Sequence, residues 1–135
     1  MKKTPIYNDE LPNLFFPWAL KVSEIKDILF VSGHADVKLD NSSANFPNDL
    51  IGQTEFILKQ ISKSIDKAGF SIKEVVRIEV TLTKKVTDTQ LPELFELLEE
   101  YLKDSPVKPA GGTLRFIDRL IGKECLIEIE FILAQ

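Results

Sequence analysis

The segment Val75-Val76-Arg77-Ile78-Glu79-Val80-Thr81-Leu82-Thr83 (residues 75–83) decides the fold of this 135-residue chain, because its side chains alternate between apolar and polar. The apolar set is Val76, Ile78, Val80 and Leu82. The polar set is Arg77, Glu79, Thr81 and Thr83. Successive side chains of a strand point to opposite faces of a sheet. The pattern therefore predicts a strand over residues 74–83 with one face in a core and one polar face.

A second alternating stretch lies at the C-terminal end of the chain, over residues 125–134. One face is formed by Ile127, Ile129, Phe131 and Leu133, and the other by Glu128, Glu130 and Ile132. Residues 111–118 follow the same rule, with Leu114 and Phe116 opposite Thr113 and Arg115. Residues 18–25 and 28–35 also have strand composition, and a tight turn is predicted between them. The chain is therefore expected to contain five strands.

Two amphipathic helices are expected between these strands. Residues 48–68 carry apolar side chains at helical spacing, and Gly69 is placed to end this helix in the left-handed conformation. Residues 88–103 form a second apolar stripe, and Thr87 and Gln90 have the spacing of a capping box at its start. The predicted order is β-β-α-β-α-β-β. It indicates an α+β fold in which two helices cover one face of a mixed sheet.

Length and composition fit one domain over residues 1–135, with residues 1–17 as an irregular N-terminal arm that contains three prolines. No apolar run reaches membrane-spanning length, and the first residues lack the apolar segment of a signal peptide. Cys125 is the only cysteine and lies in an apolar stretch, so it is expected to be a small buried side chain. We therefore expect a cytoplasmic location without membrane association.

The formal net charge is −4, and so weakly acidic a chain is not expected to bind nucleic acid, because phosphate binding needs a basic surface. The predicted sheet nevertheless has a polar face, made of Arg77, Glu79, Thr81, Thr113, Arg115, Glu128 and Glu130. This face is expected to lie free of any helix. It faces either bulk water or other subunits and a wet cleft, and composition alone does not separate these two arrangements.

Several short segments resemble, in order, the Rid family of reactive intermediate deaminases, also called YjgF-type proteins. Residues 17–22 resemble the family opening P-Y-x-x-A-V-K, and residues 29–34 resemble its L-F-V-S-G-Q strand end. Residues 75–83 resemble V-V-K-x-T-V-F-L-T, residues 109–110 match the start of P-A-R-S, and residues 127–130 match V-E-I-E. The similarity runs from about residue 17 to the C-terminal end.

The resemblance implies a chorismate-mutase-like α+β fold and a homotrimer whose sheets form a central barrel. It also implies that a small organic acid or a carbonyl metabolite binds in the cleft between neighbouring subunits. In deaminating members, an arginine after P-A holds the carboxylate of an enamine or imine acid. A glutamate of the last strand, here Glu128, helps to position the attacking water. The products are a 2-keto acid and ammonia.

Several site positions depart from the family pattern. Gly111 stands where the family has its arginine, and glycine offers no guanidinium to a carboxylate. Trp18 replaces a tyrosine, His34 replaces a glutamine, and the loop over residues 118–124 is longer than usual. These changes predict a branch of the family with another ligand or with lost activity, rather than an ordinary arginine-dependent imine deaminase.

The predicted ligand site combines one candidate catalytic residue, Glu128, with a set of candidate binding residues: Trp18, Ser32, Gly33, His34, Gly111, Gly112 and Arg115. Strand alternation predicts that Arg115 lies on the same face as Gly111 and Thr113. The Arg115 guanidinium then either reaches the cleft or pairs with Glu128 or Glu130. The two glycines are interpreted as space, because a missing side chain enlarges the cleft or lets a backbone approach closely.

The remaining candidates each have two readings. Glu128 either holds the attacking water or is a polar residue that pairs with a neighbouring subunit. His34, the only histidine, either donates to a ligand or is a satisfied hydrogen-bonding group at a strand end. Trp18 is either core or a cleft wall. One histidine and one cysteine far apart form no metal-ligand spacing, so neither a metal nor a cofactor is expected.

Two functions remain open at this point. The first is a hydrolase or deaminase that acts on a small enamine, imine or carbonyl compound, with Glu128 handling water and His34 or Arg115 orienting the ligand. The second is a non-catalytic trimer that binds a metabolite or a protein partner. Gly111 favours the second, whereas Glu128 and the Ser32-Gly33 strand end favour the first. RNA cleavage fits poorly with the acidic charge.

Overall fold

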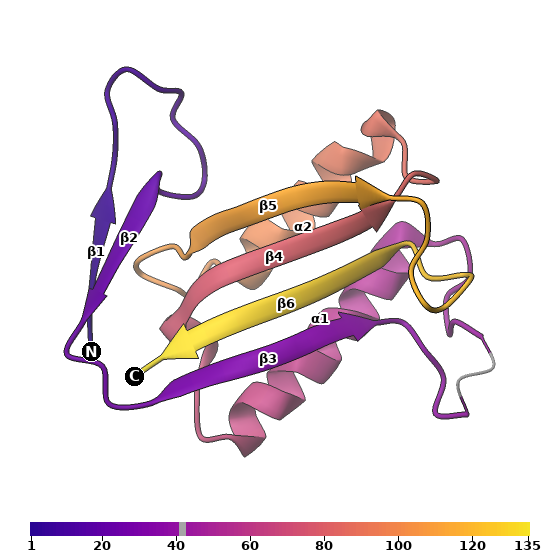
Figure 1. The fold of residues 1–135 in the computed structure, drawn as a ribbon, viewed down its shortest axis with the longest axis horizontal. Coiled ribbons are helices and arrows are strands. Elements are labelled where there is room, and N and C mark those ends of the chain that lie inside the picture. Colours follow the sequence, from indigo (N-terminus) through magenta and orange to yellow (C-terminus); the bar gives the residue numbers. More distant parts are fainter. Residues whose placement is uncertain (41–42) are drawn as a thin grey trace.

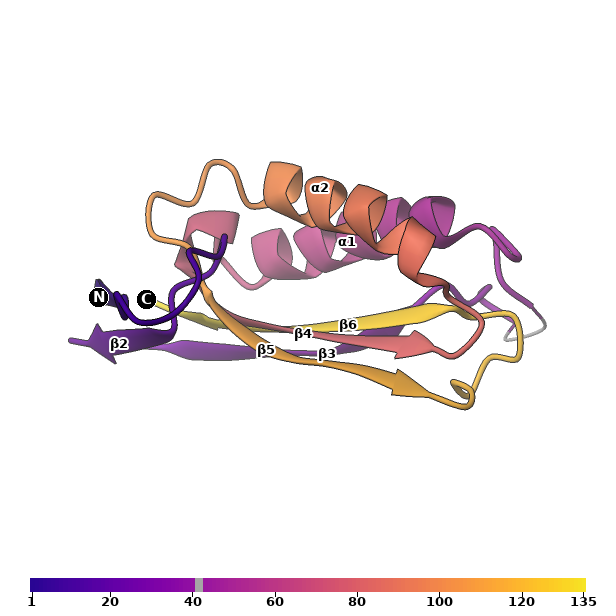
Figure 2. The ribbon, with the colours of Figure 1, turned by 90° about the horizontal axis from the view of Figure 1, so that it is seen from above.

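The computed structural model describes residues 1–40 and 43–135. Its centre is a four-stranded mixed sheet with the order β3 (Ile28–Ala35), β6 (Ile127–Ala134), β4 (Val75–Thr83), β5 (Ala110–Ile117). Strand β6 is antiparallel to both β3 and β4, and β4 is parallel to β5 (Figure 1). Helices α1 (Leu50–Lys67) and α2 (Leu91–Tyr101) lie together on one face of the sheet, as Figure 2 shows from the side. The predicted α+β arrangement is confirmed.

The helix ends follow the local signals of the sequence. The Asp49 side chain accepts a hydrogen bond from the Gly52 N–H at 2.9 Å and caps the start of α1. Gly69 follows the end of α1 with a φ of 77°, a backbone conformation that glycine adopts without a steric penalty. A short 3-10 turn, Asp88–Gln90, precedes α2 and carries the predicted capping box between Thr87 and Gln90. Neither helix of the described chain has the length and apolarity needed to cross a membrane.

The core lies between the helices and the inner face of the sheet. The apolar faces of β4 and β6 are buried there, together with the apolar stripes of both helices. Phe131, 1% exposed, stacks on Tyr101 of α2 with ring centroids 6.0 Å apart. The alternation of β4 and β6 therefore sorts apolar residues into the core and leaves the polar ones on the opposite face. Cys125 is buried as predicted, and burial together with nearby carboxylates raises the pKa of its thiol.

The N-terminal arm is not irregular throughout, which corrects the prediction for residues 1–17. Strand β1 (Lys2–Ile6) pairs antiparallel with β2 (Ala19–Ser23) in a separate two-stranded sheet, so β2 does not join the central sheet. Pro5 cannot donate to a ladder, but it is tolerated in a ribbon of edge strands. The Lys3 ammonium donates to the Lys73 and Val75 carbonyls at 2.5 and 2.7 Å, which ties this hairpin to the start of β4.

The loop predicted over residues 38–48 connects β3 to α1, and residues 41 and 42 lie outside the described part. The fully buried side chain of Asp36 holds the second half of this loop in place. Its carboxylate accepts hydrogen bonds from the Asn45 N–H at 3.1 Å, the Asn45 side-chain amide at 2.7 Å and the Phe46 N–H at 2.7 Å. A buried carboxylate is tolerated here because backbone and amide donors replace its water.

Candidate functional site

The face of the central sheet opposite the helices, here called the open face, carries the seven polar residues that the alternation predicted. The register places them in adjacent rows across the strands. In one row Thr81 lies between Arg115 and Glu128, and in the next Glu79 lies directly opposite Glu130. Neither helix covers this face (Figure 2). Three carboxylates and two guanidinium groups are thus gathered on one side of three neighbouring strands.

A bulge in β5 changes which residues share this face. Gly111 pairs with Ile78 and Leu114 pairs with Val80, so β5 contains one more residue than β4 over this stretch. One extra residue inverts the alternation. Gly111 therefore lies on the helix side, where an added Cβ would meet the Phe16 ring at 3.2 Å. The prediction that Arg115 shares a face with Gly111 is wrong, although Arg115 does lie on the open face, opposite Thr81.

Glu79 is the centre of the polar contacts on the open face. Its Oε1 accepts hydrogen bonds from Arg77 Nε at 2.9 Å and from the Arg77 terminal nitrogen at 2.6 Å. Its Oε2 accepts from the Arg115 terminal nitrogen at 2.8 Å and from the Thr113 backbone N–H at 3.2 Å. The alternative reading, in which Arg115 is bound to a carboxylate, is thus the observed one, but its partner is Glu79 and not Glu128 or Glu130.

The two arginines set the charge state of Glu79. Burial alone would raise the pKa of the Glu79 carboxyl, since it disfavours the charged form. The hydrogen bonds and positive charges of Arg77 and Arg115 outweigh that effect and hold the pKa below its ordinary value. Glu79 is therefore ionised at neutral pH, and it accepts two hydrogen bonds from Arg77 and one from Arg115.

Two glycines make room for two of the carboxylates. A Cβ at Gly112 would lie 2.4 Å from the Glu79 carboxyl carbon, and a Cβ at Gly33 would lie 2.3 Å from Glu128 Oε1. Real Cβ atoms do not approach other atoms so closely, so each glutamate side chain can lie where it does only because the neighbouring residue is glycine. Gly33 and Gly112, both predicted as binding positions, thus allow these close approaches because they have no side chain.

The end of β3 places two predicted site residues, Gly33 and His34, on opposite faces of the sheet. A second bulge lies between Val31 and His34, so Ser32 and Gly33 lie at the level of Glu130 on β6. The His34 ring Nδ1 is 2.6 Å from the Ser32 carbonyl oxygen, which fixes the ring at this strand end. Among the residues that the structure describes, the Glu128 carboxylate over Gly33 has no hydrogen-bond or ion-pair partner. Glu128 is therefore a free acceptor over Gly33 on the open face. His34 pairs with the buried Ile129, so its side chain lies on the helix side of the sheet and not beside Glu128.

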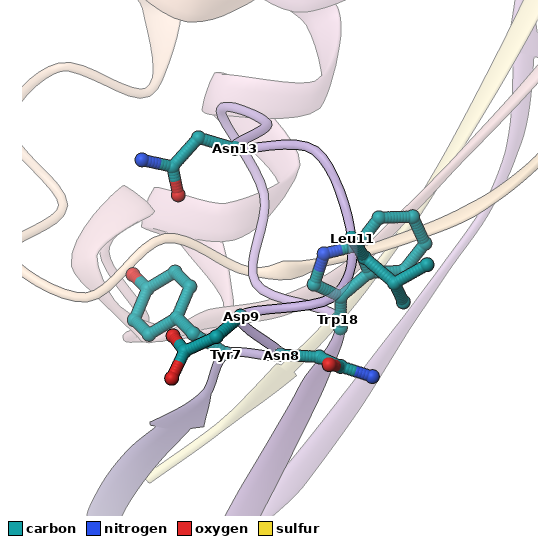
Figure 3. Close-up of a pocket in the computed structure, with 6 residues that line it drawn as sticks. All are labelled: Tyr7, Asn8, Asp9, Leu11, Asn13 and Trp18. Atoms are coloured by element: carbon teal, nitrogen blue, oxygen red, sulfur yellow. The ribbon is translucent and has the colours of Figure 1, made fainter.

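Trp18 is placed elsewhere. Its ring N–H donates to the Pro12 carbonyl at 3.2 Å, and it lines a hollow of about 270 Å³ in the loop of the β1–β2 hairpin. Figure 3 shows this hollow with its lining residues, Tyr7, Asn8, Asp9, Leu11, Asn13 and Trp18. The hairpin lies beside one end of the central sheet, whereas β3 ends at the other (Figure 1). Within one chain, Trp18 is therefore not part of the group around Glu128.

Apolar side chains border the polar rows of the open face. Phe30 is 72% exposed and lies opposite Ile132, and Ile28 near the start of the same strand is 51% exposed. Large exposed apolar side chains next to one another mark a surface for interaction. Within the described chain, no group of three His, Cys, Asp or Glu side chains is arranged to hold a metal ion.

Sequence reasoning found the polar face but missed the role of Glu79. The available signal was the i, i+2 spacing of Arg77 and Glu79 in an alternating strand, which places the two on one face next to each other. The second partner, Arg115, lies 36 residues further along the chain, so its contact depends on the pairing of β4 with β5.

Comparison with known families agrees with this fold. A family model described as endoribonuclease L-PSP matches residues 15–135. The chain belongs to this family. It is the Rid, or YjgF-type, family that the sequence segments resemble, and the match covers every strand of the central sheet and both helices.

Individual relatives of this Rid-type chain are distant in sequence. A RutC family protein from Pyrococcus abyssi is 27% identical over 132 residues, covering 98% of this chain and 97% of the relative. One from Pyrococcus horikoshii is 28% identical over 131 residues, covering 96% of each. The crystal structure of the Rid family protein YyfB from Yersinia pestis, a protein of unknown function, superposes with a TM-score of 0.85 at 19% identity over the whole of both chains. The structure of Rv2704 from Mycobacterium tuberculosis, titled a member of the YjgF/YER057c/UK114 family, gives 0.64 at 17% identity, covering 99% of this chain and all of that one. These structures share the fold.

Proposed function

We propose that this chain forms a homotrimer in which the open face binds a small metabolite between subunits, and that Glu128 there positions water for hydrolysis of an enamine, imine or carbonyl compound. One observation carries the proposal. Glu128 is the carboxylate that lies over Gly33 at the end of β3, and it has no partner among the described residues. A carboxylate without a partner at a strand-end bulge is available to accept a proton.

The proposed reaction is the addition of water to a C=N carbon. Glu128 accepts a proton from the water as the water oxygen bonds to that carbon, and it passes this proton to the nitrogen, which gives a carbinolamine. The remaining O–H proton is then transferred through Glu128 to the amine nitrogen as the C–N bond breaks, so that ammonia leaves and a carbonyl compound remains. His34 has no role in this step, because it pairs with the buried Ile129 and its side chain lies on the helix side of the sheet. The ligand differs from that of an arginine-dependent imine deaminase, because Gly111 has no side chain and Arg115 is bound to Glu79.

A trimer is supported by the exposed apolar side chains that border the polar rows. Phe30 and Ile28 would be shielded from water if the sheets of neighbouring subunits faced one another, and a wet cleft would remain over the glutamates. A reducing compartment such as the cytoplasm fits the single buried thiol of Cys125.

A second candidate is a trimer that binds a metabolite without converting it. The observation that favours it is that both open-face arginines form ion pairs with Glu79, since each cation of these strands then already has an anionic partner. Nucleic acid is a poor fit for either candidate despite the family description. The chain carries a formal charge of −4, and three carboxylates on the open face would repel phosphates.

The experiment measures ammonia release from imines that an oxidase generates in solution, from amino acids in one series and from simple amines in another. We expect acceleration by the wild-type chain and a loss of about 100-fold or more in Glu128→Gln, the range for removal of a general base. Glu130→Gln is the matched control, because it removes the neighbouring carboxylate of the same strand. Ligand binding without acceleration would support the second candidate. Absence of both binding and acceleration, or a monomer in sedimentation, would refute the proposal.

A further inference from the structure

The donors around Glu79 form the kind of set that binds a carboxylate ligand. Two guanidinium groups and one backbone N–H donate to its two oxygens, at distances from 2.6 to 3.2 Å. Arginine is the residue that proteins use most for recognising carboxylates, because its planar fork matches their geometry. Here that donor set is filled by a side chain of the same chain.

The position of the Glu79 carboxylate is built by the backbone as well as by the arginines. The β5 bulge puts Gly112 next to the carboxylate, at a place where any Cβ would collide with it. The Glu79 side chain is only 16% exposed, whereas the side chains of Arg77 and Arg115 are 45% and 46% exposed. The carboxylate thus lies close against β5, with the guanidinium groups on its outer side.

The charges of the open face disfavour the binding of a ligand that carries a free carboxylate. Arg77 and Arg115 supply two positive charges, and Glu79, Glu128 and Glu130 supply three negative ones, so these five residues carry one net negative charge. An acid that approached Glu128 would meet repulsion from Glu128 and Glu130. It would also find both guanidinium groups already bound to Glu79. A neutral amide, or an amine that donates N–H groups, meets neither obstacle.

We infer that Glu79 is an internal carboxylate that occupies the acid-binding position of the open face, and that the ligand of this face is a neutral or cationic compound bearing amine, amide or imine N–H groups and no carboxylate. The location of the ligand rests on the proposed function, whereas the occupied acid-binding position rests only on the contacts of Glu79. Glu79 is accordingly a specificity-determining residue, and it does not take part in the chemical step.

The first test removes the internal carboxylate and offers an external one. In Glu79→Ala the donors of Arg77, Arg115 and Thr113 lose their acceptor, so acetate is expected to bind there with an affinity at least about tenfold higher than to the wild-type chain. Acetate should also raise the melting temperature of the variant more than an equal concentration of chloride does. Acetate binding is followed by the amide NMR signals of residues 112–115.

Two further variants keep this test decisive. Glu130→Ala is the matched control, because it removes the carboxylate directly opposite Glu79 but takes no hydrogen-bond partner away from either arginine. This variant should gain no acetate binding. Glu79→Gln retains the side-chain volume if the alanine variant fails to fold, and it should gain affinity for acetate through the uncompensated guanidinium charges. Adding Arg115→Gln to either Glu79 variant should abolish the gain. Equal acetate binding by the wild-type chain, or no gain in either Glu79 variant, would overturn the inference.

The second test compares acids with their amides on the wild-type chain, using pyruvate against pyruvamide as the first pair. We expect the amide to bind and the acid to bind at least about tenfold more weakly. Tighter binding of the acid would overturn the inference and leave the proposed function standing. If neither class binds, the proposed function fails, and the acetate experiment still decides whether Glu79 fills an acid-binding position.

Discussion

Replacing Gly112 by alanine should displace the Glu79 carboxylate without altering any charge. The new Cβ would lie 2.4 to 2.7 Å from the carboxyl carbon and both oxygens of Glu79, and this group is the end of a flexible side chain. The backbone of β5 can therefore stay in place while the carboxylate swings away from the two arginines. The φ of Gly112 is not positive, so alanine introduces no backbone strain.

The expected cost follows from the contacts that are lost. Each partly exposed ion pair to Arg77 or Arg115 is worth about 0.2–1 kcal/mol, and the hydrogen bond from the Thr113 N–H about 1 kcal/mol. Alanine recovers about 0.4–1 kcal/mol by restricting the unfolded chain. The net destabilisation should thus be about 1–2 kcal/mol in urea unfolding at neutral pH, measured at one fixed chain concentration. Gly111→Ala is the control, because its Cβ would meet the Phe16 ring and not Glu79.

The pH dependence makes the test specific to Glu79. Because its pKa is lower in the folded than in the unfolded chain, Glu79 contributes stability above its ordinary value, and that contribution is lost as the pH falls through the folded pKa. In Gly112→Ala the carboxyl should titrate near its ordinary value, as read from its carbon chemical shift. The stability gap between the two proteins should then close in acid. An unchanged Glu79 titration in the variant would refute the reasoning.

Three further predictions concern the scaffold. Phe131→Ala should lower the free energy of unfolding by about 3–5 kcal/mol, because it empties a fully buried position, and a loss below about 1 kcal/mol in urea unfolding would contradict the described packing. Asp49→Ala should cost about 1 kcal/mol by removing the α1 cap, whereas Asp49→Asn, measured alongside, should cost little. Burial lowers the pKa of Lys3 to about 8, so the unfolded chain binds more protons above that pH and stability should rise from pH 8 towards 10.5. Lys3→Met should remove this rise, and comparison of the unfolding free energies at the two ends of that range checks it.

Much of the fold could be predicted because its signals are local. The alternation of residues 75–83 and 127–134 identified two central strands, and the capping box at Thr87 identified the start of the second helix region. The strand at residues 2–6 was not predicted, since four of its five residues are polar or proline and carry little strand signal, and its stability comes from pairing with residues 19–23. Pairing between distant segments leaves no mark in either segment alone.

The sequence by itself determined which polar side chains of β4 and β6 share one face, because an uninterrupted period of two residues sorts them. It did not determine how they pair there. One extra residue in β5 turned Gly111 to the helix side and put Gly112 beside Glu79. Whether a strand carries such a bulge depends on the register that the whole sheet adopts, which is a tertiary property. The tertiary structure therefore decided that Arg115 forms an ion pair with Glu79. It also decided the ligand class that is expected from this pair.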